Sequence, residues 1–219
     1  MSTTPARLMA AGLIAIVLTP ATTAADEVTS RIDAGARLLL TAAHGVPAND
    51  IPGYGLYGLY RLNDRWSVGL SLDQTKFDYE EPARRLGLPI DRDAPPIDAK
   101  VESLIASVIV ERSFSEPQAS REWFAGAALG MGWFDVPDVT GATTDGGTFY
   151  IDTEVDREVI LSLQGGVRQR FGERWFGEFT LRADQHFAAW EPVDRVSGAE
   201  TRHEDYFAYG FHLGVGYRF

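Results

Sequence analysis

The sequence predicts an all-β protein: an eight-stranded antiparallel up-and-down transmembrane β-barrel that follows a cleaved signal peptide. Three observations support this prediction. Apolar and polar residues alternate with a period of two along most of the chain, the alternating segments are long, and short connections alternate with long ones. Side chains of a strand point alternately to its two faces, so each such segment has one apolar face and one polar face.

The N-terminus has the layout of a secretory signal peptide. Arg7 supplies a positive charge, residues 8–18 are apolar throughout, and small residues lead to Ala24 and Ala25, after either of which cleavage is expected. The apolar run is too short to span a bilayer as a helix, which needs about 20 residues. We therefore expect a signal peptide at residues 1–25 and a single barrel domain at residues 26–219.

Eight segments show the alternation and are long enough to be strands of such a barrel. They cover residues 31–43, 54–62, 66–79, 99–113, 122–135, 154–170, 175–189 and 205–219. Strands of soluble proteins usually have about five or six residues, whereas tilted membrane strands need about 9–11. The lengths of the segments therefore favour a membrane barrel.

The connections between these segments alternate in length. The shorter ones are residues 63–65, 114–121 and 172–174, and the longer ones are 44–53, 80–98, 136–153 and 190–204. Short periplasmic turns and longer outer loops are typical of outer-membrane barrels. An even number of strands then puts both ends of the barrel domain on the periplasmic side.

The two faces of the expected strands differ in chemistry. In the last segment, one parity is apolar and aromatic: Phe207, Tyr209, Phe211, Leu213, Val215, Tyr217 and Phe219. The inward parities of the strands supply a polar lumen network: Asp73, Glu111, Glu158, Arg168, Glu178, Arg182, Asp184, His186 and His212. Both signs of charge are present, which allows the interior to neutralise itself, since an unpaired buried charge would be costly. An apolar outside and a polar inside invert a soluble barrel, and this favours the membrane.

Two segments fit the alternation less well. The second has tyrosine on both parities, at Tyr57 and Tyr60, which leaves its faces undecided. In the third, Phe77 and Tyr79 fall on the inward parity near its outer end, and we expect a β-bulge there that shifts the register.

The tryptophans lie near the ends of the expected strands. Trp66, Trp123 and Trp175 each follow a short connection, and Trp133 lies ten residues beyond Trp123 on the same parity. That spacing corresponds to about 25 Å along the membrane normal, which matches the apolar band of about 25 Å in outer-membrane barrels. We expect these four residues to form interfacial aromatic girdles rather than a soluble core, and Trp190 to lie near the outer boundary.

Composition excludes some classes of function. The net charge of -11 argues against a nucleic-acid partner, which would need a basic patch. The absence of cysteine fits export through an oxidising periplasm. The outer loops are acidic and could meet divalent cations or basic partners. We favour a solvated charged surface instead, and none of the loops has EF-hand spacing. We expect no cofactor and no metal site.

The chain ends Gly214-Val215-Gly216-Tyr217-Arg218-Phe219. This end resembles the terminal strand of bacterial outer-membrane proteins, whose C-terminal phenylalanine is read by the barrel-assembly machinery. The resemblance implies that Tyr217 and Phe219 act as an assembly signal. The mature chain looks like the small eight-stranded class, similar to the barrel of outer-membrane protein A or to outer-membrane protein W. This resemblance implies a monomer in the Gram-negative outer membrane, surrounded by lipid that includes lipopolysaccharide. We expect no peptidoglycan-binding domain after Phe219.

Three hypotheses for function follow. The first is a non-enzymatic barrel with a structural, surface-interaction or stress-related role and a lumen filled by side chains, since eight strands leave just enough room for them. The second is a narrow conduit for small or apolar solutes. It is allowed by apolar residues among the inward polar groups: Ile105, Ile109, Phe124, Phe134 and Ile160.

The third hypothesis is an enzyme that modifies lipid A or phospholipid. His186 and Asp184 share one inward face and form the best candidate dyad, with Ser162 as nucleophile and His212 as a second candidate base. The alternative is that these histidines belong to the lumen network. No nucleophile-elbow pattern of the Gly-x-Ser-x-Gly type is present, and we favour the network.

Overall fold

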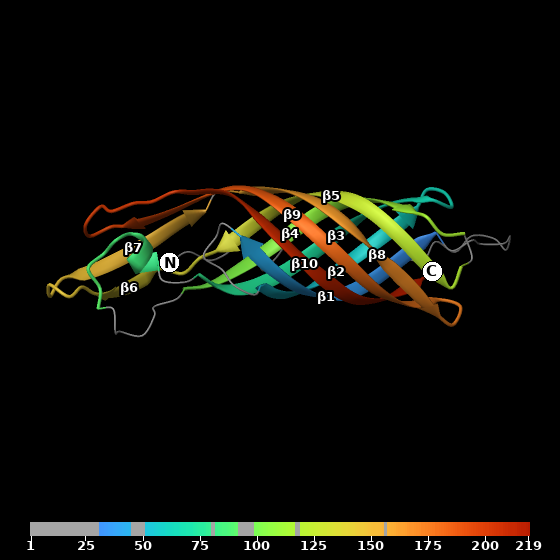
Figure 1. Cartoon of the computed structure of the whole chain (residues 1–219), viewed down its shortest axis with the longest axis horizontal. Coiled ribbons are helices and arrows are strands. Elements are labelled where there is room, and N and C mark those ends of the chain that lie inside the picture. Colours follow the sequence, from blue (N-terminus) through green and yellow to red (C-terminus); the bar gives the residue numbers. More distant parts are fainter. Residues whose placement is uncertain (1–30, 45–50, 80–81, 92–98, 117–118, 156) are drawn as a thin grey trace.

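The protein is a closed antiparallel barrel of eight strands (Figure 1). The computed structural model describes residues 31–44, 51–79, 82–91, 99–116, 119–155 and 157–219. The barrel strands are β1 (Ile32–His44), β2 (Ile51–Arg61), β3 (Trp66–Tyr79), β4 (Ala99–Ser113), β5 (Arg121–Asp135), β8 (Glu158–Phe171), β9 (Trp175–Asp194) and β10 (His203–Arg218). Strand β10 pairs with both β9 and β1, which closes the sheet and leaves no open edge in the barrel. The predicted fold class is confirmed, and the expected signal peptide lies outside the described residues.

The barrel strands follow the sequence prediction closely, and β3 and β4 have the predicted bounds. Strand β9 continues to Asp194 instead of ending at residue 189, and β8 begins at Glu158 instead of residue 154. Residue 154 belongs to a separate strand, β7 (Thr148–Val155), which also has the alternation of a strand. In the part of the chain that the structure describes, no helix is both long and apolar enough to cross a membrane.

The predicted loop at residues 136–153 is instead a folded extension of the barrel wall. Strand β6 (Val139–Ala142) pairs with β7, and β7 pairs with the end of β9 from Val155↔Trp190 to Ile151↔Asp194. The short helix α2 (Pro82–Arg85) lies beside them, beyond the barrel in Figure 1. The loop prediction was wrong because each strand is short, and their few apolar residues become buried only through contacts far along the sequence.

These apolar residues form what we call the outer cluster, at the end of the barrel opposite the short turns. It consists of Ile51, Phe77, Tyr79, Ala83, Ala99, Val101, Val139, Phe149, Ile151 and Trp190. The expected bulge in β3 is absent, because the register with β4 runs without a shift from Trp66↔Arg112 to Tyr79↔Ala99. Phe77 and Tyr79 point inward because this end of the lumen is apolar.

Trp190 has a different environment from the other tryptophans. It is 1% exposed. Its ring packs against those of Phe77, Tyr79 and Phe134, with centroids 5.3–6.1 Å apart. It therefore lies inside the outer cluster rather than at the surface near the outer boundary.

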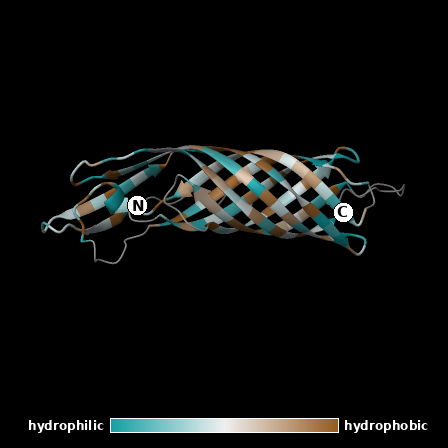
Figure 2. Ribbon diagram, in the orientation of Figure 1, coloured by the Kyte–Doolittle hydropathy of each residue, from teal (hydrophilic) through white to brown (hydrophobic). Residues whose placement is uncertain are grey.

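The polarity of the barrel is inverted relative to a soluble protein. Hydrophobic and hydrophilic residues alternate along the barrel strands in Figure 2. Leu38 and Leu163, on the outer face, are 64% and 65% exposed, whereas Asp73 and Arg168, on the inner face, are 2% and 3% exposed. In β2, Tyr57 points inward and Tyr60 outward, which settles the faces of that strand. Lipid is the only solvent that stabilises such an apolar outer surface.

This polarity leads to a first prediction. Leu161 lies on the outer face of β8 opposite Leu129, and is 48% exposed. We expect Leu161→Arg to lower the free energy of unfolding from lipid vesicles by about 2–4 kcal/mol, because the arginine would face hydrocarbon at mid-strand. Ile32→Arg, at the periplasmic rim, is the matched control and should cost about 0–1 kcal/mol. Equal costs at the two positions would show that the outer face does not contact hydrocarbon.

Candidate functional site

The lumen holds the largest group of buried charges among the described residues. Arg168 on β8 lies at the centre of this group, in the half of the lumen nearer the short turns. Its guanidinium donates to Glu111 on β4 at 2.7 Å and to Glu178 on β9 at 2.5 Å. The ring of Phe124 lies 4.1 Å from the guanidinium carbon. Arg168 is therefore held by three strands, and its charge is shared by two carboxylates.

Neutral groups complete the coordination of these two carboxylates. Gln164 donates its side-chain amide to Glu111 at 2.8 Å, and the Tyr57 and Thr180 hydroxyls donate to Glu178 at 3.1 and 3.0 Å. Burying a carboxylate is costly unless its lone pairs are satisfied, so these bonds are what allow two acids to share one arginine.

A second layer lies above the first and is centred on Asp73 of β3. Arg37 on β1 donates to both carboxylate oxygens of Asp73, with a shortest distance of 2.7 Å. Arg182 on β9 reaches the same carboxylate at 3.3 Å, its neighbour Asp184 at 2.7 Å and the Ser162 hydroxyl at 2.8 Å. Two arginines and two aspartates make this layer formally neutral.

Close approach in this layer requires a glycine. A Cβ built on Gly55 of β2 would collide with the Asp73 carboxylate. The absence of a side chain on β2 therefore gives Asp73 the space from which it can meet arginines of β1 and β9 together. Arg37 was not among the sequence-predicted lumen residues, although an arginine between Ala36 and Leu38 on the inward parity was a usable signal.

A third layer lies between the charges and the outer cluster. Glu158 is fully buried, and its carboxylate lies 3.1 Å from Nδ1 of His186. The ring of Tyr206 stacks on His186 with centroids 4.2 Å apart, and its hydroxyl donates to Glu158 at 3.4 Å. Strands β8 and β9 thus contribute ion-paired side chains to more than one layer of the lumen. The predicted His212 is buried in the same lumen at 2% exposure.

The catalytic dyad suggested by the sequence is not assembled. His186 faces Glu158, whereas Asp184 and Ser162 are both bound by Arg182. In the described part of the chain, the Ser162 hydroxyl therefore accepts a hydrogen bond from an arginine and forms no hydrogen bond with a histidine side chain. No group of three or more potential metal ligands occurs among these residues either.

A separate charge cluster lies at the periplasmic end of the lumen and was missed by the sequence analysis. Asp33 pairs with Arg61 at 2.8 Å and with Arg218 at 2.7 Å. Glu122 pairs with the same two arginines at 2.9 and 3.4 Å. These residues come from the ends of β1, β2, β5 and β10, where strand-end charges look like ordinary solvated turn residues in the sequence.

Comparisons with known proteins agree with this architecture. No protein-family model matches the sequence, and no curated protein matches it. The outer membrane protein OprG from Pseudomonas aeruginosa superposes with a TM-score of 0.62 at 11% identity, over 86% of this chain and 94% of that one. The outer membrane protein AlkL, solved in lipid bilayers, gives 0.55 at 12% identity, over 92% and 97%.

The chain has the fold of the small eight-stranded outer-membrane barrels. Its outward apolar face and inward charges are those of an integral outer-membrane barrel. The orientation of this barrel follows from its connections, because the tight turns between β2 and β3 and between β8 and β9 mark the periplasmic end.

The four tryptophans that the sequence assigns to aromatic girdles lie on the outer face of the outer-membrane barrel. Trp66, Trp123 and Trp175 are 43%, 56% and 52% exposed at the periplasmic end, and Trp133 is 41% exposed at the other end. Exposed rings near both ends of the barrel are compatible with the girdles expected from the sequence, whose place in the membrane stays a prediction.

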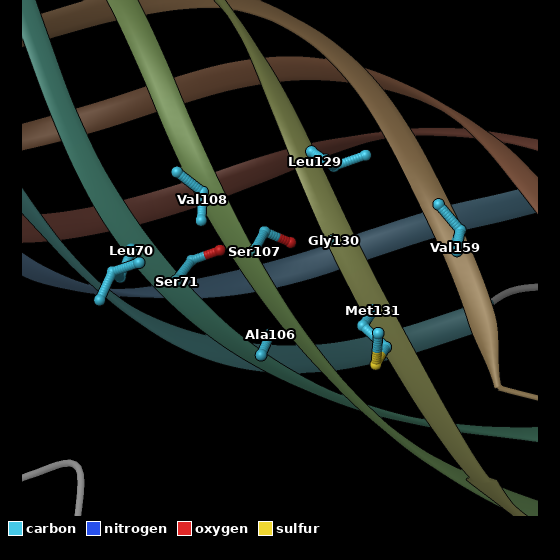
Figure 3. Close-up of a pocket in the computed structure, with 9 residues that line it drawn as sticks. All are labelled: Leu70, Ser71, Ala106, Ser107, Val108, Leu129, Gly130, Met131 and Val159. Carbon is cyan, nitrogen blue, oxygen red and sulfur yellow. The ribbon is translucent and has the colours of Figure 1, made fainter.

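The lipid-facing surface also carries a depression of about 350 Å³ over β3, β4, β5 and β8 (Figure 3). Larger side chains surround Ala106 there, among them Leu70, Leu129 and Met131. The side chain of Ala106 is shorter than its neighbours, which leaves a hollow that suits an apolar group.

The outer extension of the barrel is held by its own polar contacts. Asp194 accepts hydrogen bonds from the backbone of Tyr150 at 2.9 Å and of Ser197 at 3.0 Å, which fixes the turn after β9 to β7. At the tip between β6 and β7, the hydrogen bond from the Thr143 hydroxyl lowers the pKa of the Asp145 carboxyl. The extension is therefore a folded unit rather than a loop.

The burial of Arg168 leads to a second prediction. Arg168→Met leaves Glu111 and Glu178 without their cation, and we expect a loss of about 3–5 kcal/mol in the free energy of unfolding. Arg195→Met is the matched control, since Arg195 bridges Asp152 and Glu154 at the surface and should cost about 0–1 kcal/mol. Equal losses measured by denaturant titration in the same vesicles would contradict a buried network.

Proposed function

We propose that this protein is a non-conducting, non-enzymatic outer-membrane barrel whose task is to hold a folded extension at the cell surface. The observation that carries the proposal is the ion-paired lumen, in which Arg168, Arg182 and Asp73 are each 5% exposed or less. An eight-stranded barrel is just wide enough for its side chains to fill. Ion pairs in two layers along the barrel axis support a lumen that is plugged by side chains rather than an open pore.

The outer cluster supports the same function. It seals the outer end of the lumen with apolar rings and anchors β7 to β9, so the extension is attached to the barrel as a rigid continuation. Tyr150 and Val196 remain 37% and 60% exposed on it. Exposed apolar side chains on a folded support suit contact with another molecule, and surface segments are where barrels of this kind usually carry their function.

The lumen chemistry supports a non-enzymatic role. Acyl transfer needs a nucleophile and a base within hydrogen-bonding reach. Ser162 is bound to Arg182 instead, and His186 to Glu158.

Export and assembly are part of the proposal. Residues 1–25 would direct secretion, and Tyr217 and Phe219 would be read by the barrel-assembly machinery. The ring of Tyr217 packs against those of Trp175 and Phe219, with centroids 5.1 and 4.9 Å apart, so the terminal aromatics line one face of the periplasmic rim. The mature monomer would be surrounded by outer-membrane lipid, including lipopolysaccharide.

A narrow conduit for small apolar solutes is the second candidate. The observation that favours it is the stretch of buried apolar groups inside the barrel, where Ile109, Phe124 and Ile160 are at most 4% exposed. Such groups could line a path only if the layers around Arg168 and Asp73 moved apart.

Planar bilayers test the plug, and this is the third prediction. We expect no stable unitary conductance from the native protein, because ion pairs fill the lumen. The double variant Arg168→Ala, Arg182→Ala should conduct, since it removes two long side chains from the plug, whereas Arg195→Ala on the extension should not. A reproducible channel in the native protein, or uptake of apolar solutes by its proteoliposomes, would replace the plug with the conduit.

A further inference from the structure

We propose that the periplasmic end of the β3–β4 face binds one phospholipid of the inner leaflet, with its phosphate between Arg65 and Arg112 and one acyl chain extended along β4. The site would select a headgroup that carries an ammonium, as phosphatidylethanolamine does. Two separate observations on one strand, a charged depression and an apolar one, carry the proposal.

The charged depression lies at the rim between the β2–β3 turn and the end of β4. Its volume is about 390 Å³, and Arg65, Arg112, Asp64 and Glu116 line it. Within the described chain, neither arginine side chain has a carboxylate partner, in contrast to the paired arginines of the lumen. A phosphate is the anion that a membrane supplies at this depth, and guanidinium groups bind it in two-pronged geometry.

The side chain of Arg112 faces the lipid and is held in place by its neighbours. Arg112 follows Val110 on the outward parity of β4 and is opposite Trp66 of the girdle. Its guanidinium carbon lies 5.8 Å from the ring centroid of Trp66 and 5.5 Å from that of Phe114. Two aromatic rings therefore hold the guanidinium at headgroup level while its N–H donors stay available.

The carboxylates in the same depression decide which headgroup fits. Asp64 and Glu116 would pair with an ammonium next to the phosphate, whereas the uncharged glycerol of phosphatidylglycerol would leave both carboxylates without an opposite charge. Both signs of charge in one depression therefore match a zwitterionic headgroup better than a purely anionic one.

The apolar depression lies where the acyl chain would end. The outward row of β4 runs from Arg112 through Val110 and Val108 to Ala106, which lines the hollow in Figure 3. At about 3.3 Å per residue and a tilt near 40°, Ala106 lies about 15 Å deeper than Arg112. That depth is slightly more than half of the apolar band of about 25 Å, so an acyl chain that ends there would reach the bilayer midplane.

Native mass spectrometry in detergent tests this site. The native protein is incubated with phosphatidylethanolamine or phosphatidylglycerol that have identical chains, and the bound fraction is measured. We expect one bound phosphatidylethanolamine, and about tenfold weaker binding in Arg112→Gln because a charge-assisted contact is lost. Ala106→Leu, which fills the apolar depression, should also weaken binding.

Matched controls separate the site from general effects on the barrel. Arg174→Gln removes a rim arginine that already donates to the Tyr217 hydroxyl at 3.0 Å, and Ala36→Leu enlarges an exposed outward alanine on β1. Both should bind lipid as the native protein does, and circular dichroism confirms that every variant is folded. Equal binding by Arg112→Gln and the native protein, equal losses in the controls, or equal retention of phosphatidylglycerol would each overturn the proposal.

Discussion

The rest of the barrel depends on the two ion pairs that Arg168 forms with Glu111 and Glu178. A guanidinium at 3% exposure needs carboxylates within reach, and Glu111 and Glu178 come from strands that are not adjacent to each other. Glu178 is the cross-strand neighbour of Arg168 on β9, whereas Glu111 lies on β4, beyond β5, so the curvature of the closed sheet brings Glu111 to the same guanidinium. Closure of the barrel and neutralisation of its interior are therefore one requirement, and lipid around the apolar exterior makes the arrangement stable.

The sequence predicted the parts of the fold that depend on local alternation. Period two sufficed for the eight strands, for the turns that orient the barrel and for which side chains face inward. It failed at Phe77 and Tyr79, where apolar residues on the inward parity suggested a bulge. The lumen is not polar along its whole length, and the outer cluster that buries these two rings draws on β6, β7 and α2, which lie far from them in sequence.

The pairing inside the lumen could not be read from the sequence for a related reason. The alternation in sequence predicts that Asp73 and Arg182 both face the lumen. Which partner each side chain contacts depends on strand tilt and on the space left by residues without a side chain, such as Gly55. His186 and Asp184 share a face two residues apart and still point to different partners. The rim residues Asp33 and Glu122 were missed, since a charge at a strand end has the same local pattern whether it is solvated or buried.

A double-mutant cycle between Arg168 and Glu178 tests the central claim most directly. The free energy of unfolding is measured for Arg168→Met, Glu178→Leu and the double variant in lipid vesicles. If the buried pair couples the adjacent strands β8 and β9 inside a dry lumen, the double variant is more stable than the sum of the two losses requires, by about 0.5–3 kcal/mol. Additive losses, within about 0.5 kcal/mol, would show two solvated charges in a wet lumen and contradict the account.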